Sequence, residues 1–162
     1  MRILPLLAVA LIAAPALAFA QDDGCAKFKW SILHERDLMK APADVGASGE
    51  ISLGKGFRVA LAATDMVRFA APPERAPKPS THAAALALNV DKAGTYDVTL
   101  SDEGWVDIVT GGAVVKSSDF SGARGCAGVR KSVRFALPAG AATLQLSNID
   151  AETIEVAVVP AP

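Results

Sequence analysis

The chain has 162 residues, a formal net charge of −1 and a sequence pI near 6.1. This length allows one domain, and the balanced charge excludes both the basic surface of a nucleic-acid-binding protein and an acidic tail. With only two histidines and two cysteines, most metal and triad chemistries are also disfavoured. We therefore expect no nucleic-acid partner and no cofactor.

The first twenty residues have the pattern of a secretory signal peptide. Arg2 supplies the positive charge, residues 3–14 form an apolar run, and small residues up to Ala20 fit a cleavage site after that residue. An uncleaved membrane anchor is the alternative, but the run is short and two acidic residues follow it instead of a stop-transfer pattern. We expect a periplasmic or secreted protein in which residues 1–20 are removed, residues 21–162 form one domain and no transmembrane segment remains.

Both cysteines lie in the exported part of the chain, where an oxidising compartment favours pairing over free thiols. A Cys25–Cys126 disulfide would close a loop of about 100 residues and stabilise the fold by roughly 4 to 5 kcal/mol in the chain-entropy description. A lipid-modified Cys25 is the alternative, but the Leu-x-x-Cys pattern that such processing needs is missing. A reactive cysteine would need a histidine close by in the sequence, and none is present.

The first part of the mature chain contains one helical turn and two loops. Residues 25–40 read as a short strand that runs into a helix, which Ser31 could cap. Residues 41–55 are rich in alanine, glycine and serine and form a loop before a strand over 56–62. Four prolines make residues 71–80 an extended, stiff loop rather than a flexible linker.

From residue 82 onward, apolar side chains recur at every second position, which is the period of a strand with one buried face. Turn-forming residues separate the runs at a spacing typical of a sandwich or barrel, and no helical pattern lies between them. The predicted strands cover residues 86–90, 95–100, 105–110, 133–137, 144–146 and 154–158. We expect a mainly β fold, an antiparallel β-sandwich of jelly-roll-like type with a short N-terminal helix.

Asp107 is the only polar residue within the apolar run Trp105–Val109, which otherwise has the composition of a central strand covered on both faces. We interpret it as an outward side chain with a hydrogen bond at a sheet edge or turn. A calcium site shared with Asp102, Glu103 or Asp150 is the alternative, although no recognised calcium-loop spacing supports it.

Candidate catalytic residues are few. An iron(II) site of two histidines and a carboxylate would have to combine His34 and His82 with Glu35 or Asp37, but adjacent helical residues point about 100° apart, which makes joint ligation by His34 and Glu35 awkward. The serines of residues 117–121 lack the glycines of a nucleophile elbow and are interpreted as turn formers. We therefore assign no catalytic residue and no metal ligand.

Two groups of side chains are candidate binding surfaces. The densest positive patch could bind an anionic ligand, because arginine suits carboxylates and phosphates; it consists of Arg124, Arg130, Lys131 and Arg134. Arg130 and Arg134 would share one strand face and Lys131 would point the opposite way. The alternative is an outward sheet face balanced by cross-strand acids such as Glu152 and Glu155.

Three aromatic residues form the second candidate surface. Trp30, Tyr96 and Trp105 could make a platform for a sugar ring. The alternative is that they belong to the hydrophobic core, because a chain with only 6% aromatic residues needs them there.

Four segments carry a resemblance to a known family: residues 24–30 (GCAKFKW), residues 104–107 (GWVD), residues 117–120 (SSDF), and Cys126 followed by RKSVRF at 130–135. Through them most of the mature chain resembles a family of small exported bacterial proteins, to whose members the name homogentisate 1,2-dioxygenase is sometimes attached. The resemblance implies the disulfide and the β fold. It does not imply the enzyme, because a ring-cleaving dioxygenase of that name is far longer and binds iron through a histidine-rich site. The later half is also similar to β-sandwich domains appended to secreted peptidases, which contribute binding or stability.

The expected function is therefore that of a non-catalytic, exported β-sandwich that binds a partner protein, a glycan or an envelope component. A small metal-dependent, dioxygenase-like enzyme that uses His34 and His82 is the second hypothesis. A structural envelope protein is the third.

Overall fold

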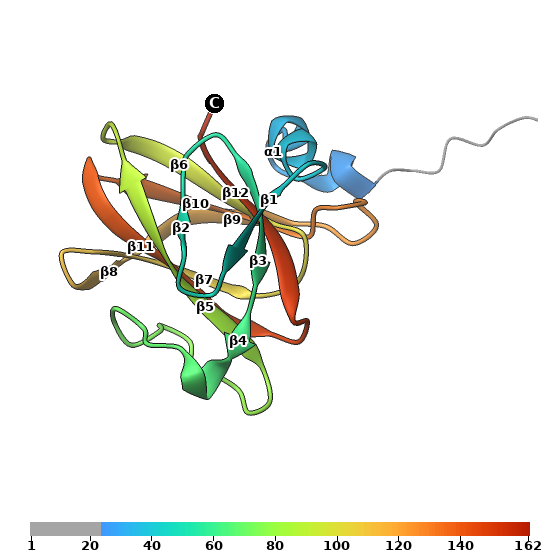
Figure 1. Ribbon diagram of the computed structural model, residues 1–162. Helices are drawn as coiled ribbons and strands as arrows, with labels where there is room; N and C mark the ends of the chain where they lie inside the picture. The colour runs from blue at the N-terminus through green and yellow to red at the C-terminus, as the bar shows by residue number, and fades with distance from the viewer. Residues whose placement is uncertain (1–23) are drawn as a thin grey trace, which may run out of the picture.

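The computed structural model describes residues 24–162 of the chain and is mainly β (Figure 1). The predicted signal peptide, residues 1–20, lies outside the described residues. The helical elements are η1 (Gly24–Lys27), α1 (Leu33–Leu38) and η2 (Thr64–Met66). The strands are β1 (Ala43–Gly46), β2 (Glu50–Ile51), β3 (Gly56–Ala60), β4 (Ala62–Ala63), β5 (His82–Val90), β6 (Gly94–Leu100), β7 (Trp105–Thr110), β8 (Ala113–Val115), β9 (Ser117–Gly122), β10 (Lys131–Leu137), β11 (Gly140–Ile149) and β12 (Thr153–Pro160).

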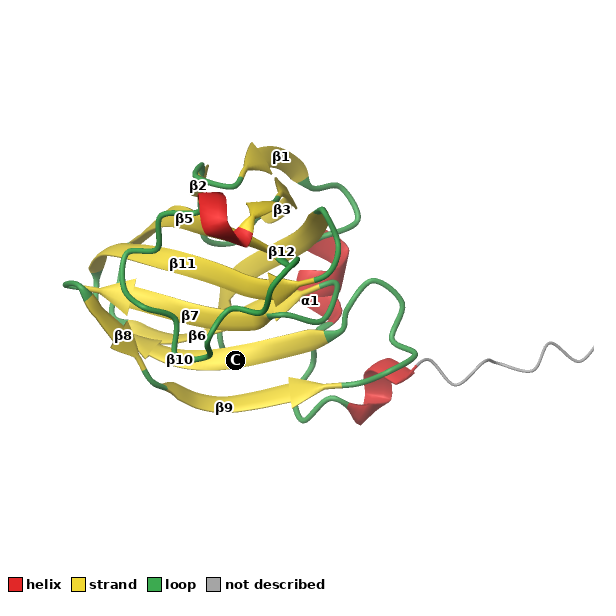
Figure 2. Ribbon diagram, turned by 90° about the horizontal axis from the view of Figure 1, so that it is seen from below, coloured by secondary structure: helices red, strands yellow, loops and turns green. Residues whose placement is uncertain are grey.

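The strands form two sheets that lie over one another (Figure 2). Sheet A has the order β1-β3-β12-β6-β10-β9, and sheet B has the order β2-β5-β11-β7-β8, with β4 also paired to β5. The expected antiparallel pairing is correct for the long strands. It is wrong for β1 with β3 and for β2 with β5, which are parallel pairs, so both sheets are mixed. The cause is the path of residues 43–63, which alternates between the sheets, so that β1 and β3 enter sheet A in the same direction.

The inner faces of both sheets share one hydrophobic core, and its residues follow the predicted alternation. Side chains at every second position of the long strands are buried together, including Leu86, Leu88, Val98, Leu100, Val133, Phe135, Leu144, Leu146, Val156 and Val158. This packing confirms the strands that were predicted from residue 82 onward. Burial of these aliphatic side chains is the main source of stability for such a fold.

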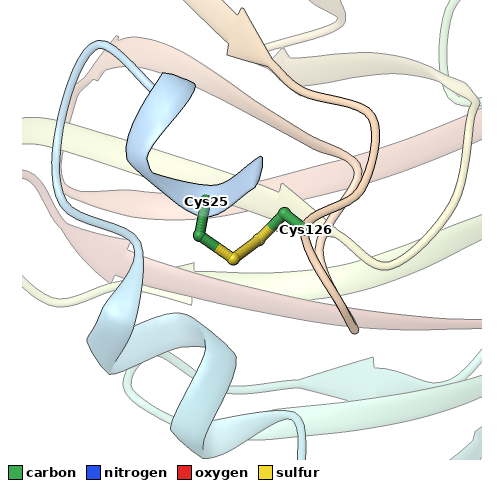
Figure 3. Close-up of a disulfide and its surroundings, with 2 residues drawn as sticks. All are labelled: Cys25 and Cys126. Atoms are coloured by element: carbon green, nitrogen blue, oxygen red, sulfur yellow. A yellow bond between two sulfur atoms is a disulfide. The ribbon is translucent and has the colours of Figure 1, made fainter. Parts of the chain in front are cut away.

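The outer face of sheet A is covered by the N-terminal segment, residues 24–40. Phe28, Ile32 and Met39 pack there in a second apolar cluster with Cys126 and Ala157. The predicted Cys25–Cys126 disulfide is confirmed, with the two Cα atoms 4.5 Å apart and 101 positions apart in the sequence (Figure 3). The crosslink therefore ties the covering segment to the loop that precedes β10.

The outer face of sheet B is covered by residues 64–81, which we call the covering loop. Gln145 of β11 holds it by accepting hydrogen bonds from the backbone N–H groups of Ala70 and Ala71 and by donating one to the carbonyl oxygen of Ala71. Asn148 accepts a hydrogen bond from the N–H of Lys78. Asn148 has a φ of 58°, a left-handed conformation that asparagine tolerates, next to a register shift in β11.

Several local expectations differ from the structure. Residues 25–40 contain the helical elements η1 and α1 and no strand, and the loop expected over residues 41–55 contains the strands β1 and β2. Ser31 does not cap the helix: the N-cap residue is Ile32, without a side-chain cap, because α1 begins two residues after Ser31. The serines of residues 117–121 lie in strand β9 instead of a loop, because they pair with β10. Asp107 faces away from the core, as expected, but is only 1% exposed because the covering loop lies over it. Within residues 24–162, no helix is long and apolar enough to cross a membrane.

Candidate ligand pocket between the sheet edges

A pocket opens where two strand edges face each other without a covering strand. Strand β8 pairs only with residues 108–110 of β7, so the first half of β7 has no neighbour on that side. Strand β9 is the last strand of sheet A. Between them lies a cavity of about 230 Å³ whose lining residues are Glu74, Trp105, Val106, Ser117, Phe120, Lys131 and Val133.

The walls of the pocket are an accessible part of the inter-sheet core. Val106 and Val133 are core residues and are each 5% exposed. Phe120 pairs with Val133 across β9 and β10, so it lies on the same face, yet it is 64% exposed. Phe120 lies on β9, the last strand of sheet A. A large apolar side chain held open to solvent beside core residues is a typical feature of a binding site.

Lys131 places a positive charge in this apolar setting. Its Nζ donates a hydrogen bond to the carbonyl oxygen of Gly104 at 2.9 Å and lies 5.3 Å from the centre of the Trp105 ring. The backbone at Gly104, just before β7, packs closely against Ile149 of β11. A Cβ atom at Gly104 would lie 2.8 Å from Cγ1 of Ile149. Every other lysine of residues 24–162 is exposed, whereas Lys131 is half-buried. Burial lowers the pKa of Lys131, and nearby Glu103 acts in the opposite direction.

Trp105 is fixed in place by a buried carboxylate. Its Nε1 donates to Oδ1 of Asp107 at 2.9 Å, and the backbone N–H of Glu74 donates to Oδ2 of Asp107 at 3.3 Å. Burial raises the pKa of Asp107, while these two hydrogen bonds favour its charged form. The guanidinium of Arg75 also lies 5.2 Å from the Trp105 ring centre, so two cations contact this indole.

The predicted positive patch does not form one surface. Arg124 is exposed in the loop before β10, and Arg130 precedes β10 and pairs with Glu103 at 2.6 Å. Lys131 lines the pocket, whereas Arg134 lies on the opposite face of β10, as the strand alternation predicts. The prediction that Arg130 and Arg134 share one strand face is therefore wrong, because the strand begins only at Lys131.

The acids expected to balance this patch have other positions. Glu155 pairs with Arg58, 3.1 Å away across β3 and β12. Burial raises the pKa of Glu155, but hydrogen bonds with Ser101 and Arg58 outweigh this effect, so the pKa is lowered. Glu152 is exposed at the turn before β12. The acids that do meet the predicted patch are Glu103 and Asp97.

Arg134 belongs to a buried polar cluster beneath the N-terminal segment. It forms two hydrogen bonds of 2.7 Å with Asp97, whose side chain is fully buried, and lies 4.2 Å from the ring centre of Trp30. Trp30 donates through Nε1 to the hydroxyl of Ser132. Glu35 of α1 is 3% exposed nearby, and its burial, with a smaller effect of Asp97, raises its pKa.

The three aromatic residues of the predicted platform lie in three different places. Trp30 packs on the outer face of sheet A with Arg134, and Trp105 lines the pocket. Tyr96 is a core residue whose hydroxyl donates to the carbonyl oxygen of Lys92. Trp105 instead shares its surroundings with Phe120.

The two histidines lie in different layers. His34 is exposed on α1, which covers sheet A, whereas His82 begins β5 of sheet B. Glu35 is buried and Asp37 pairs with Lys40, 3.1 Å away. In the part of the chain that the structure describes, no group of three or more histidine, cysteine, aspartate or glutamate side chains is placed to hold a metal ion.

Sequence reasoning gave no binding role to five of the residues that line the pocket: Glu74, Val106, Ser117, Phe120 and Val133. Phe120 carried a usable signal, since it is the only large apolar residue in a segment of serines, glycine and aspartate. Glu74 carried none, because its place depends on the path of the covering loop.

No protein-family model, no curated protein and no solved structure matches this chain.

Proposed function

We propose that this chain is an exported, non-catalytic binding protein, and that part of a partner protein, a glycan or an envelope component enters the pocket between β7 and β9. Export through a cleaved signal peptide, the family resemblance and the jelly-roll-like connectivity stay predictions. They bear on where the protein works and do not affect the argument for the pocket.

The observation that carries the proposal is the combination of Lys131 with an accessible apolar wall. An ammonium group has three donors, and one of them reaches the carbonyl oxygen of Gly104. A ligand oxygen could accept from another. Phe120 and Trp105 would contact the apolar part of the same ligand.

The volume limits what can enter. An apolar cavity of about 150 Å³ is large enough for benzene. The present cavity, at about 230 Å³, would therefore hold one ring with a small substituent or one large side chain of a partner. This size favours recognition of a single sugar unit or a single residue over enclosure of a large molecule.

The second hypothesis, a metal-dependent enzyme, would need His34 and His82 in one site, but His34 lies on α1 over sheet A and His82 lies in strand β5 of sheet B. No observation favours it over binding. A purely structural envelope role stays a prediction that the following titration separates from ligand binding.

The test is an NMR titration of the indole Nε1–H signal of Trp105 with three probes: N-acetylglucosamine, glucuronate and N-acetylphenylalanine amide. We expect at least one probe to shift this signal to saturation in the wild-type protein. Ser117→Phe should abolish the shift by filling the pocket. Ser118→Phe is the matched control, since Ser118 lies next to it on β9 but does not line the pocket, and its hydroxyl donates to the backbone carbonyl of Arg134. If no probe saturates, or if Ser117→Phe binds as the wild type does, the proposal is wrong.

A further inference from the structure

Lys131 differs from the other described lysines in its surroundings. It is half-buried and lines an apolar pocket beside the Trp105 ring, whereas Lys29, which also contacts an aromatic ring, and Lys116 are exposed. Among residues 24–162, it makes no salt bridge, although Arg130 beside it pairs with Glu103. Its amine is thus partly shielded from water and has no salt-bridge partner among these residues, although the nearby carboxylates of Glu103 and Asp107 favour its charged form.

Neighbouring cations act in the same direction as the apolar walls. Burial is the largest cause of the lowered pKa of Lys131, and Arg75 and Arg130 act in the same direction. Glu103, with a larger effect than either arginine, and Asp107 favour the charged form, and the pKa is lowered on balance. Lysines in apolar pockets or beside other cations are the ones that act as amine nucleophiles toward carbonyl compounds.

We propose that Lys131 is a covalent attachment site that forms a reversible imine with small aldehydes carrying one apolar ring. The proposal rests on the proposed function, because it uses the same pocket, and adds a covalent bond between Lys131 and the ligand. The ring would lie against Phe120 and Val133, which form the apolar wall, and the aldehyde carbon would meet the amine.

The chemistry requires no redox partner. The Lys131 ammonium first loses a proton to water, and the neutral amine then forms a C–N bond to the carbonyl carbon while the C=O electron pair moves to oxygen. Proton transfer from nitrogen to oxygen gives a carbinolamine. Its hydroxyl group then leaves with the remaining proton of the nitrogen as water while the nitrogen lone pair forms the C=N bond, so one aldehyde is consumed and one water is released.

The test is reductive trapping at neutral pH with benzaldehyde and sodium cyanoborohydride, which converts the imine into a stable benzylamine. Peptide mass mapping during the early reaction gives the labelling rate of each lysine. We expect Lys131 to be benzylated severalfold faster than Lys116, the exposed internal control that lies just before β9. In Lys131→Arg, labelling of Lys116 should be unchanged.

Ser117→Phe separates a pocket effect from simple amine reactivity. It should slow benzylation of Lys131 to the rate of Lys116 or below, while formaldehyde, which is too small to need the pocket, should still methylate Lys131. Equal benzylation of Lys131 and Lys116 in the wild-type protein, or fast benzylation that survives in Ser117→Phe, would overturn the proposal. Fast, pocket-dependent benzylation without saturable binding of the three NMR probes would instead retain the imine site and reject the proposed function.

Discussion

The guanidinium of Arg134 forms two parallel hydrogen bonds of 2.7 Å with the carboxylate of Asp97, a side chain that solvent does not reach. The two residues face each other across β6 and β10, and the N-terminal segment lies over them with Trp30 against the guanidinium. A buried ion pair of this geometry contributes little net stability compared with apolar residues, but removal of one partner leaves an uncompensated charge.

Arg134→Met should therefore destabilise the protein by about 3 to 5 kcal/mol, because the Asp97 carboxylate stays buried without its counter-ion. Urea unfolding at neutral pH measures the change. Combining Arg134→Met with Asp97→Leu should recover part of the loss. Arg124→Met, at an exposed loop position, is the control and should alter stability by less than about 0.5 kcal/mol. Equal stabilities of Arg134→Met and the control would contradict the prediction.

Cys25→Ser should lower the free energy of unfolding by about 2 to 5 kcal/mol, because the unfolded chain gains the freedom of a loop spanning 101 positions. Thermal melts of the wild type with and without reductant should differ in the same direction. The double variant that also carries Cys126→Ser should match the single variant. A wild type that melts identically in both conditions would show that the crosslink does not stabilise the fold.

Gln145→Leu should loosen the covering loop. The substitution leaves two backbone N–H groups and one carbonyl at Ala70 and Ala71 without their partner, which costs about 1 to 3 kcal/mol for each buried group left unsatisfied. Hydrogen exchange should accelerate at these two residues, while the core strands β6 and β10 keep their protection. Thr143→Leu, on the same face of β11, serves as the control. Unchanged exchange at Ala70 and Ala71 would indicate that other contacts hold the loop.

Glu35→Gln should stabilise the protein at neutral pH and have a smaller effect in acid. Burial raises the pKa of Glu35 above its ordinary value of 4.5. Between pH 4.5 and this raised pKa, the Glu35 carboxyl is protonated in the folded protein and ionised in the unfolded chain. Wild-type stability therefore falls as pH rises from 4.5 through the raised folded-state pKa. Glutamine has no such titration, so the stability difference between variant and wild type should grow over this window.

Urea unfolding at a series of pH values measures this difference. Glu50→Gln, at an exposed position of β2, is the control. A difference between Glu35→Gln and the wild type that does not change with pH would show that burial of this carboxyl is not what matters.

The core strands could be predicted because a strand's side-chain period is a local property of the backbone. The buried face can be read from apolar residues at every second position, as for Leu86, Val98 and Val156. The pairing of β1 with β3 could not be read in this way. These strands are short, and their direction depends on a chain path that crosses between the sheets.

The pocket could be predicted only in part from the sequence, for the same reason. Lys131 and Trp105 were both singled out from the sequence, but in different groups, one as part of a positive patch and the other as part of an aromatic platform. They meet because β7 and β10 belong to different sheets whose uncovered edges face each other. Phe120 completes the pocket from β9, the last strand of sheet A.

The amino-acid sequence by itself determined the mainly β fold, the alternating core and the pairing of Cys25 with Cys126, since each follows from local periodicity or from the presence of only two thiols. Only the tertiary structure decided that Asp97 receives Arg134, that residues 64–81 cover sheet B, and that Lys131 enters an apolar pocket. These relationships depend on which strands become neighbours and where an edge stays open, and such long-range pairing leaves no signature in the local pattern of residues.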